Sequence, residues 1–543
     1  MIDTIRQRVL GALGEKGLPA DGVTVEFIEG AAHGDITTNA AMVAAKAAGM
    51  PPHELARVLM SMLMSIEGIE RIEAAGPGFI NFTLTDAALG DAVAAIGERY
   101  GTSGSQAGTR VMIEYTDPNP FKEFHIGHLM SNAIGESIAR LTEAAGASVF
   151  RANYEGDVGP HVARALWGKL QEPELAWGEA YALGAREYEA HKEEIDVINR
   201  KVYDQSDPAI DALYRQGREE SLAHFEALYA LLGTRFDHYF FESETAPIGV
   251  ALVEGHPEVF EESDGATVYR GEQDGLHTRV FITRDGLPTY EAKDLGLIRL
   301  KADTWPADSS ITVTANEQQE YFKVMRAAAM RIMPELAAAV RHITHGMMRL
   351  SSGKMSSRTG DVITGESLLM KLIEAAKGRA SESKADDPEQ LAQQIAVAAI
   401  KFQILRQGIG KDIVFDEARA LSLEGDSGPY VQYAHARACS VVAAAAAEGI
   451  EPSPAAPASD GERAIARILM RFPAAVLRAQ VACEPHHVAQ YANALASRYN
   501  SWYAQERVLG SDRAAARAAL TRAVARTLRN ALDLLGIEAP EKM

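Results

Sequence analysis

A strand–helix–strand unit constrains the fold of this chain more than any other feature. An apolar run typical of a buried strand begins at Arg110, and the turn-rich segment 116–124 follows it. From Ile126 the apolar residues recur at helical spacing until Gly146, and a second strand pattern begins at Ser148. Because strands joined through a helix lie parallel, this unit predicts an α/β fold with a parallel sheet.

The rest of the chain divides around this unit. Residues 1–108 mix helical patterns with strand-like runs and end in a Gly/Ser-rich linker at 101–108, whereas 161–234 have helical patterns without clear strands. A Pro/Ala/Ser linker at 447–461 lies between helical segments. The predicted domains are an α+β N-terminal domain at 1–108, an α/β domain at 109–365 with a helical insertion at about 161–234, a helical connector at 366–412 and an all-α domain at 413–543.

Composition narrows the class of protein. Among 543 residues the two cysteines, Cys439 and Cys483, argue against a disulfide framework or a cysteine-rich zinc module. No stretch of 18 uncharged apolar residues occurs, so we expect a cytoplasmic protein that does not cross a membrane. The net charge is −20, yet residues 462–543 carry twelve basic and seven acidic side chains. That excess permits a polyanionic partner at one end, although a solvated helix face is the alternative.

The motif His125-Ile126-Gly127-His128 stands where the predicted loop passes into the helix. A helix N-terminus exposes unpaired N–H groups and positive dipole, and Gly127 lets a flat ligand approach the backbone. This arrangement suits a nucleoside triphosphate. Two loop or capping histidines are the alternative interpretation.

A second motif, Gly353-Lys354-Met355-Ser356-Ser357, follows the α/β region. Its flexible backbone, lysine charge and hydroxyl groups are good partners for phosphates, although many surface loops have the same composition. The order of the two motifs, at either end of one α/β domain, makes a phosphate site the stronger interpretation.

Together the two motifs resemble the HIGH and KMSKS signatures of class I aminoacyl-tRNA synthetases. Their surroundings resemble the arginyl-tRNA synthetases along nearly the whole chain, at 34–39, 76–81, 114–125, 236–243, 290–294, 428–437 and 535–543. The resemblance implies a Rossmann-type catalytic domain, a tRNA-contacting N-terminal domain and a helical anticodon-binding domain.

The resemblance also implies a reaction, in which an arginine–tRNA ligase uses ATP with Mg²⁺ to join L-arginine to tRNA(Arg). A monomer is the family tendency, and no dedicated metal site is expected. The implied catalytic residues are His125, His128, Lys122 and Lys354, and the implied ATP-binding residues are Gly127, Lys354, Met355, Ser356 and Ser357.

Two positions depart from the common class I pattern. Ser357 stands where many class I enzymes have a second lysine, which removes a cation from the phosphate site. Lys122, three residues before His125, is placed to supply that charge, and the family is known for this substitution. Val158 stands where the family more often has tryptophan, a packing difference that leaves the role of Asp157 open.

An arginine pocket needs carboxylates and an aromatic or hydroxyl neighbour for the planar guanidinium. Tyr290 and Asp294, four residues apart, lie on one helix face. By resemblance Glu242 is a second carboxylate, Asn119 and Gln318 hold the α-amino end, and Glu114 lines the pocket. A surface salt bridge of Asp294 with Lys293 or Arg299 is the alternative that spacing leaves open.

The resemblance implies two tRNA contacts. Phe79 and Asn81 would meet the D-loop, and the residues expected at the anticodon are Tyr430, Tyr433, Tyr491 and Met543. Each tyrosine has a core role as its alternative. At 100° per residue, Arg513 and Arg517 face away from Arg522, Arg526 and Arg529, so only some of them can touch phosphate.

Two rival functions remain. A class I ligase for another amino acid, such as cysteine, usually needs a zinc–thiolate site, which two separated cysteines do not favour. A catalytically silent tRNA-binding homologue is the other rival. It would be expected to have lost His125, His128 or Lys354, and all three are present.

Overall fold

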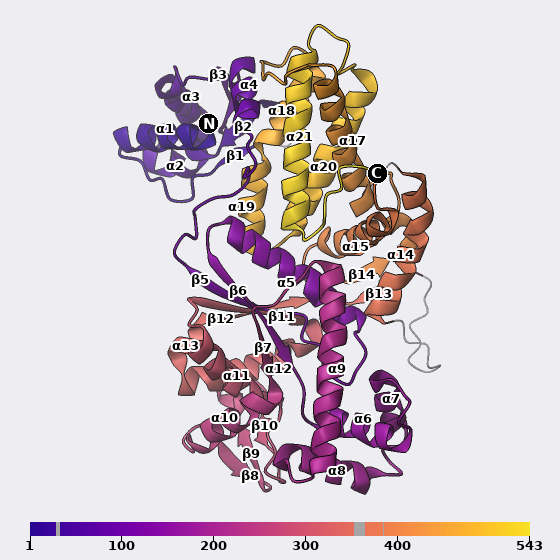
Figure 1. Ribbon diagram of the computed structural model, residues 1–543. Helices are drawn as coiled ribbons and strands as arrows, with labels where there is room; N and C mark the ends of the chain where they lie inside the picture. The colour runs from indigo at the N-terminus through magenta and orange to yellow at the C-terminus, as the bar shows by residue number, and fades with distance from the viewer. Residues whose placement is uncertain (29–32, 352–363, 384) are drawn as a thin grey trace.

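A parallel sheet lies at the centre of the computed structural model, which describes residues 1–28, 33–351, 364–383 and 385–543 (Figure 1). Its strands run in the order β12-β11-β5-β6-β7, with every neighbouring pair parallel. Their bounds are β5 (Arg110–Glu114), β6 (Ser148–Glu155), β7 (His238–Phe241), β11 (Ser309–Ala315) and β12 (Val340–His345). The predicted Rossmann-type sheet is confirmed. The strand order reverses between β5 and β11, where such sheets bind ligands beyond the strands' carboxyl ends.

Helix α5 (Ile126–Ala144) connects β5 to β6, with the start that the sequence predicts. It is buried along most of its length because both the sheet and other helices pack on it. The neighbouring elements of this domain are α10 (Glu242–Glu254), α11 (Tyr290–Thr304), α12 (Gln319–Ile332) and α13 (Pro334–Ala339), with the antiparallel strands β8 (Glu261–Ser263), β9 (Ala266–Tyr269) and β10 (Arg279–Ile282) and the short 3₁₀ helices η2 (Gly271–Asp274) and η3 (Asn316–Gln318).

Between β6 and β7 the chain forms a helical insertion with its own apolar core around Val162, Trp167 and Ile195. Its helices are α6 (Pro160–Gln171), α7 (Trp177–Arg186), α8 (Lys192–Asp204) and α9 (Pro208–Leu232). Asp207 caps α9 by accepting the N–H of Ala209, and the left-handed Gly233 ends it. Figure 1 shows α9 running from the insertion back to α5.

The N-terminal region is an antiparallel sheet of order β1-β2-β4-β3 covered by helices, beside α18 and α19 in Figure 1. Its elements are α1 (Ile2–Glu15), β1 (Val25–Phe27), β2 (Ile36–Thr38), α2 (Ala40–Ala48), α3 (Pro52–Leu63), β3 (Ile69–Ala75), β4 (Phe79–Leu84) and α4 (Asp86–Ala94). The sequence patterns indicated β1 and β4. Strand β3 was not predicted, because its residues Ile69, Ile72 and Ala75 recur at three-residue rather than two-residue spacing.

The C-terminal region is helical, as the sequence predicts. Its elements are α14 (Gly365–Glu382), α15 (Pro388–Leu405), β14 (Ile413–Phe415), α16 (Glu417–Ala420), α17 (Gly428–Ala447), α18 (Asp460–Met470), α19 (Phe472–Ala482), α20 (His486–Gln505) and α21 (Ala514–Leu534). The short strand β14 departs from the helical prediction because it pairs in parallel with β13 (Met348–Leu350), far away in the sequence. Within the described ranges, no helix is long and apolar enough to span a membrane.

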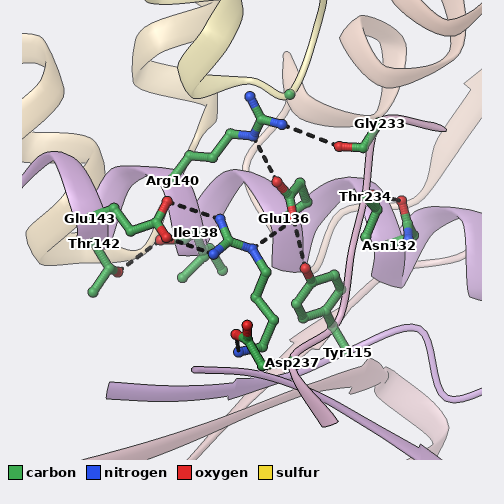
Figure 2. Close-up of polar contacts among 12 residues, drawn as sticks. Tyr115, Asn132, Glu136, Ile138, Arg140, Thr142, Glu143, Gly233, Thr234 and Asp237 are labelled. Carbon is green, nitrogen blue, oxygen red and sulfur yellow. Dashed lines mark hydrogen bonds and ion pairs between the residues drawn. The ribbon is translucent and has the colours of Figure 1, made fainter. Parts of the chain in front are cut away.

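A buried polar network fixes α5 against the elements around it (Figure 2). The Glu136 carboxylate accepts hydrogen bonds from the Tyr115 hydroxyl at 2.6 Å and from Arg140 Nε at 2.7 Å, and Arg151 Nε lies 3.1 Å from it. Arg140 also donates to the carbonyl of Gly233, at the end of α9, and to Asp533 on α21. One carboxylate of α5 thereby organises contacts with the sheet, the insertion and the C-terminal helices.

We expect Glu136→Ala to destabilise the fold strongly. Removing one partner of a buried ion pair costs about 3–5 kcal/mol, because the remaining charge stays buried without compensation. Thermal unfolding followed by circular dichroism should show a midpoint several degrees lower. Glu374→Ala is the matched control, since Glu374 forms an exposed ion pair with Lys377 on α14. Equal midpoints for the two variants would contradict the proposed importance of Glu136.

Candidate active site

The candidate site lies at the carboxyl ends of the central strands. Glu114 is the last residue of β5, and Glu242 begins α10 directly after β7. Gly156, just beyond β6, lies between Asn119 and Glu242. A Cβ atom there would lie 2.2 Å from Asn119 Oδ1 and 3.3 Å from the Glu242 carboxyl carbon. Only glycine permits this approach, so the loops after different strands bring Asn119 and Glu242 together.

The two motif histidines form one turn at the start of α5. The backbone N–H of His125 donates to Nδ1 of His128 at 3.1 Å, and the ring centres are 5.3 Å apart. A nitrogen that accepts cannot carry the ring proton, so in neutral His128 the proton is on Nε2. The capping role that the sequence left open is therefore real, and it leaves Nε2–H of His128 as a donor.

Both histidines are neutral at physiological pH. Burial lowers the pKa of His128 to about 3, with the charges of His125 and Lys122 acting in the same direction. Burial and Lys122 also lower the pKa of His125. The pair can therefore donate hydrogen bonds to phosphate oxygens, but positive charge at the site has to come from other residues.

Lys122 lies in the same loop as the histidines. Its ammonium is 5.0 Å from the ring centre of Tyr181, on the insertion, and burial lowers its pKa although the Glu242 carboxylate opposes that change. The sequence placed Lys122 beside His125 as a compensating cation, and in the structure its charge acts on both histidines.

The second motif falls outside the described residues, and with it Lys354, Met355, Ser356 and Ser357. The chain that follows meets the start of α5: the N–H of Gly365 donates to the Phe124 carbonyl at 2.8 Å. Gly127 is exposed, and a Cβ atom added there would contact nothing within 4 Å. The backbone at the start of α5 is thus open to a ligand.

Buried lysines form ion pairs with two of the carboxylates expected in the arginine pocket. Lys293 Nζ lies 2.6 Å from Glu242, and Lys301 pairs with Glu114. Asp294 instead accepts a hydrogen bond from the hydroxyl of Tyr321. The salt bridge that spacing allowed for Asp294 is absent in the described part of the chain, since Arg299 pairs with Asp303 and Lys293 with Glu242.

The surroundings of Asp294 also shift its pKa. Burial raises its pKa to about 8, helped by the charges of Glu114 and Glu242 and opposed by the Tyr321 hydrogen bond. The carboxyl is therefore largely protonated at neutral pH and becomes ionised when a cation binds beside it. Tyr290 is 61% exposed, and Gln318 is also exposed.

Several contributing residues were missed by the sequence analysis. Lys293 and Lys301 lie on α11 with Asp294, and Tyr321 lies on α12, but which carboxyl each contacts depends on tertiary packing. Asp157, whose role was open, accepts the N–H of Ser243 and the hydroxyl of Tyr214, both at 2.8 Å. It therefore holds the loop after β6 against α9 and α10.

The nearby substitution at Val158 has a packing explanation. Val158 is buried in the apolar core of the insertion, beside Phe121 and Trp167. The residue after Asp157 thus packs within the apolar core of the insertion.

The expected D-loop residues lie on β4. Phe79 is half-buried, whereas Asn81 is buried and its Oδ1 accepts a hydrogen bond from the Thr37 hydroxyl at 2.7 Å. Phe79 is therefore the more accessible of the two for stacking on a base.

The expected anticodon residues differ in exposure. Tyr491 has the core role, since its ring packs on Phe472 and its hydroxyl donates to the Ile468 carbonyl at 3.0 Å. Tyr430 and Met543 are half-buried against the main apolar core. Tyr433 is half-buried, and the Arg437 guanidinium lies 4.7 Å from its ring centre.

Several C-terminal arginines pair with acidic side chains on other elements. On one side of α21, Arg517 pairs with Glu462 at 2.8 Å and with Glu506 at 2.6 Å. On its other side, Arg526 and Arg529 both pair with Glu98. The two predicted faces exist, and each contributes to domain packing.

Comparisons with known proteins agree along the chain. Family models match at residues 2–84 (arginyl tRNA synthetase N terminal domain), at 93–172 and 251–417 (tRNA synthetases class I (R), catalytic domain) and at 431–543 (DALR anticodon binding domain). The chain is 30% identical to an arginine–tRNA ligase of Latilactobacillus sakei, with 98% of each chain covered, and 30% identical to one of Treponema pallidum, with 92% of this chain and 91% of that one covered.

A solved structure gives the same result. The Thermus thermophilus arginyl-tRNA synthetase superimposes with a TM-score of 0.85 at 28% identity, over the full length of both chains. The similarity thus includes the N-terminal sheet and the C-terminal helices as well as the parallel sheet.

The raised pKa of Asp294 predicts pH-dependent binding of the expected ligand, L-arginine. A guanidinium selects the ionised carboxylate, so binding below pH 8 must release the proton from Asp294 and weakens about tenfold per pH unit. Calorimetry at pH 7 in buffers of different ionisation enthalpy should find close to one proton released per arginine bound. Asp303→Asn, an exposed change on the same helix, should keep this release, and Asp294→Asn should abolish it. Binding without proton release would contradict the assignment.

Proposed function

Since the chain belongs to the arginyl-tRNA synthetase family and is a class I arginine–tRNA ligase, we propose that the site beyond β5 and β11 forms arginyl-adenylate from L-arginine and ATP. The arginyl group then passes to the 3′-terminal ribose of tRNA(Arg), giving AMP. The observation that carries this assignment is the combination of an acidic pocket around Asp294 with the histidine pair at the start of α5, both beyond the switch point of the parallel sheet.

In the first step the arginine carboxylate attacks the α-phosphorus of ATP in line, and pyrophosphate leaves. Positioning and charge neutralisation account for such a reaction without a covalent enzyme intermediate. The neutral His128 and His125 donate hydrogen bonds to ATP, and Gly127 admits it to the N-terminus of α5. Lys122 and Lys354 supply the positive charge, aided by Met355, Ser356 and Ser357 of the second motif.

The amino acid lies across the ends of the strands. Asp294, Glu242 and Tyr290 receive the guanidinium, while Asn119, Gln318 and Glu114 surround the α-amino end. The proximity of Asn119 to Glu242 across Gly156 supports a single pocket of this kind. Ionised carboxylates in the plane of the guanidinium accept its paired N–H donors.

Mg²⁺ would accompany ATP in this proposal and would help to neutralise the charge of its phosphate groups. The metal ion would supply further positive charge where pyrophosphate leaves. The protein's own contribution is therefore the hydrogen bonds and cations already named.

Two tRNA contacts complete the proposal. Phe79 and Asn81 meet the D-loop, and Tyr430, Tyr433 and Met543 meet the anticodon, where aromatic rings stack on unpaired bases. Burial of Tyr491 argues for a supporting role beneath that surface. We propose that the enzyme acts as a cytoplasmic monomer.

The proposal is tested by ATP–pyrophosphate exchange with each of the twenty amino acids, with and without total tRNA. Exchange with arginine alone is the expected result, and dependence on tRNA would add that the tRNA-binding regions control the first step. Exchange with a different amino acid would overturn the pocket assignment. The absence of exchange with all twenty would favour a tRNA-binding homologue without catalysis.

We expect His128→Ala to lower the rate of exchange by about 10² or more, because a hydrogen-bond donor to the transition state is lost. The arginine KM should change little, since His128 lies outside the pocket for the amino acid. His277→Ala, on an exposed loop, is the control. Unchanged circular dichroism with normal exchange in the His128 variant would refute the assigned role.

A further inference from the structure

A lysine of the protein itself lies inside the pocket proposed for the arginine side chain. Lys293 is buried, its ammonium is 2.6 Å from Glu242 Oε2, and it lies 5.4 Å from the ring centre of Tyr290. On the other side its ammonium is 5.9 Å from the ring centre of Tyr203, on the insertion. Lys293 therefore contacts two of the three groups assigned to the guanidinium.

The Lys293 ammonium stays charged at this position. Burial alone would lower its pKa, but Glu242 and Tyr203 raise the pKa above its usual value. Lys301 neutralises Glu114 in the same way on the next turns of α11. Of these carboxyls, Asp294 alone has no lysine or arginine partner among the described residues, so it is the group left for a cationic substrate.

Arginine and lysine differ in how they could share this space. A guanidinium is planar, spreads its charge over three nitrogens and offers five donors, so it can bridge Asp294 and the second oxygen of Glu242. A substrate ammonium is a compact, strongly hydrated charge. To reach the carboxylates it would have to approach the ammonium of Lys293, and like charges repel strongly where water is excluded.

We infer that Lys293 is a specificity-determining residue, whose ammonium fills the place beside Glu242 that the ammonium of a substrate lysine would take. Lysine is then rejected by an occupied site as well as by its shorter reach. Arginine is accepted because Asp294 remains available to it. The inference rests on the proposed arginine site and adds to it the residue that distinguishes the two basic amino acids.

The test compares exchange with lysine and with arginine in three variants, in the presence of tRNA(Arg). Lys293→Gln and Lys293→Met remove the charge, and Lys293→Arg keeps it. We expect the ratio of kcat/KM for lysine to that for arginine to rise at least about tenfold in the Gln and Met variants, mainly through a lower lysine KM. The Arg variant should retain the original ratio.

Two controls separate specificity from general damage. Lys323→Gln changes an exposed lysine on α12 and should leave both activities unchanged. Lys301 lies on the same helix as Lys293 and pairs with Glu114. Lys301→Gln leaves Glu114 without this partner and should lower both activities without changing their ratio. The Gln variant of Lys293 keeps a hydrogen-bond donor for Glu242, so it provides the test if the Met variant unfolds.

The possible outcomes distinguish this inference from the proposed function. An unchanged lysine-to-arginine ratio in folded Lys293→Gln overturns the specificity role. An increase in Lys293→Arg equal to that in Lys293→Gln overturns the charge argument. Failure of the unmutated chain to use arginine would instead overturn the proposed function.

Discussion

Helices α9 and α21 both end beside helix α5. There Lys401 and Arg140 donate hydrogen bonds to the carbonyls at the two helix ends. Lys401 Nζ donates to the carbonyl of Leu232 at 2.6 Å, at the end of α9, and to that of Gly536 at 2.8 Å, just beyond α21. Arg140 likewise donates to the carbonyls of Gly233 and Asp533. The last carbonyls of a helix have no partners within it and carry partial negative charge, so a shared cation stabilises both ends. Burial and the charge of Arg140 lower the pKa of Lys401 to about 7, against the opposing charges of Glu136 and Glu538, and its amino group can donate to both carbonyls in either protonation state.

The same helix begins with the histidine motif, so the junction with α9 and α21 lies on the element that carries His125 and His128. Near the first turns of α5, Ser131 accepts the N–H of Thr116 at 3.0 Å and donates to the carbonyl of Val313 at 2.9 Å. These bonds tie α5 to the chain beyond β5 and to β11, the two strands that flank the switch point. Ser137, two turns later, donates to the carbonyl of Leu534 on α21 at 2.7 Å. These bonds connect the C-terminal helices to the element that begins at His125 and His128.

The sequence predicts those features that depend on local order. The strand, loop and helix around His125 are continuous in the chain, so periodicity and turn residues were sufficient to place them and to identify the parallel sheet. The charges inside the pocket could not be predicted in this way. Spacing suggested that Asp294 pairs with Lys293 or Arg299 on its own helix, but Lys293 instead reaches Glu242, 51 positions earlier. Such a choice is decided by which elements pack together, and β14 was missed for the same reason.

The partners of the C-terminal arginines also depend on which elements pack together. Their excess suggested either a surface for a polyanion or a solvated helix face, yet Arg467 pairs with Asp35 and Arg463 with Asp86, both in the N-terminal region. Asp35 is buried and also accepts the N–H of Leu84, so this contact reaches the sheet that carries Phe79. Part of the basic tail therefore pairs with acidic groups of the N-terminal region, which carries one of the two proposed tRNA contacts. These ion pairs contribute to the relative placement of the regions proposed to contact the D-loop and the anticodon.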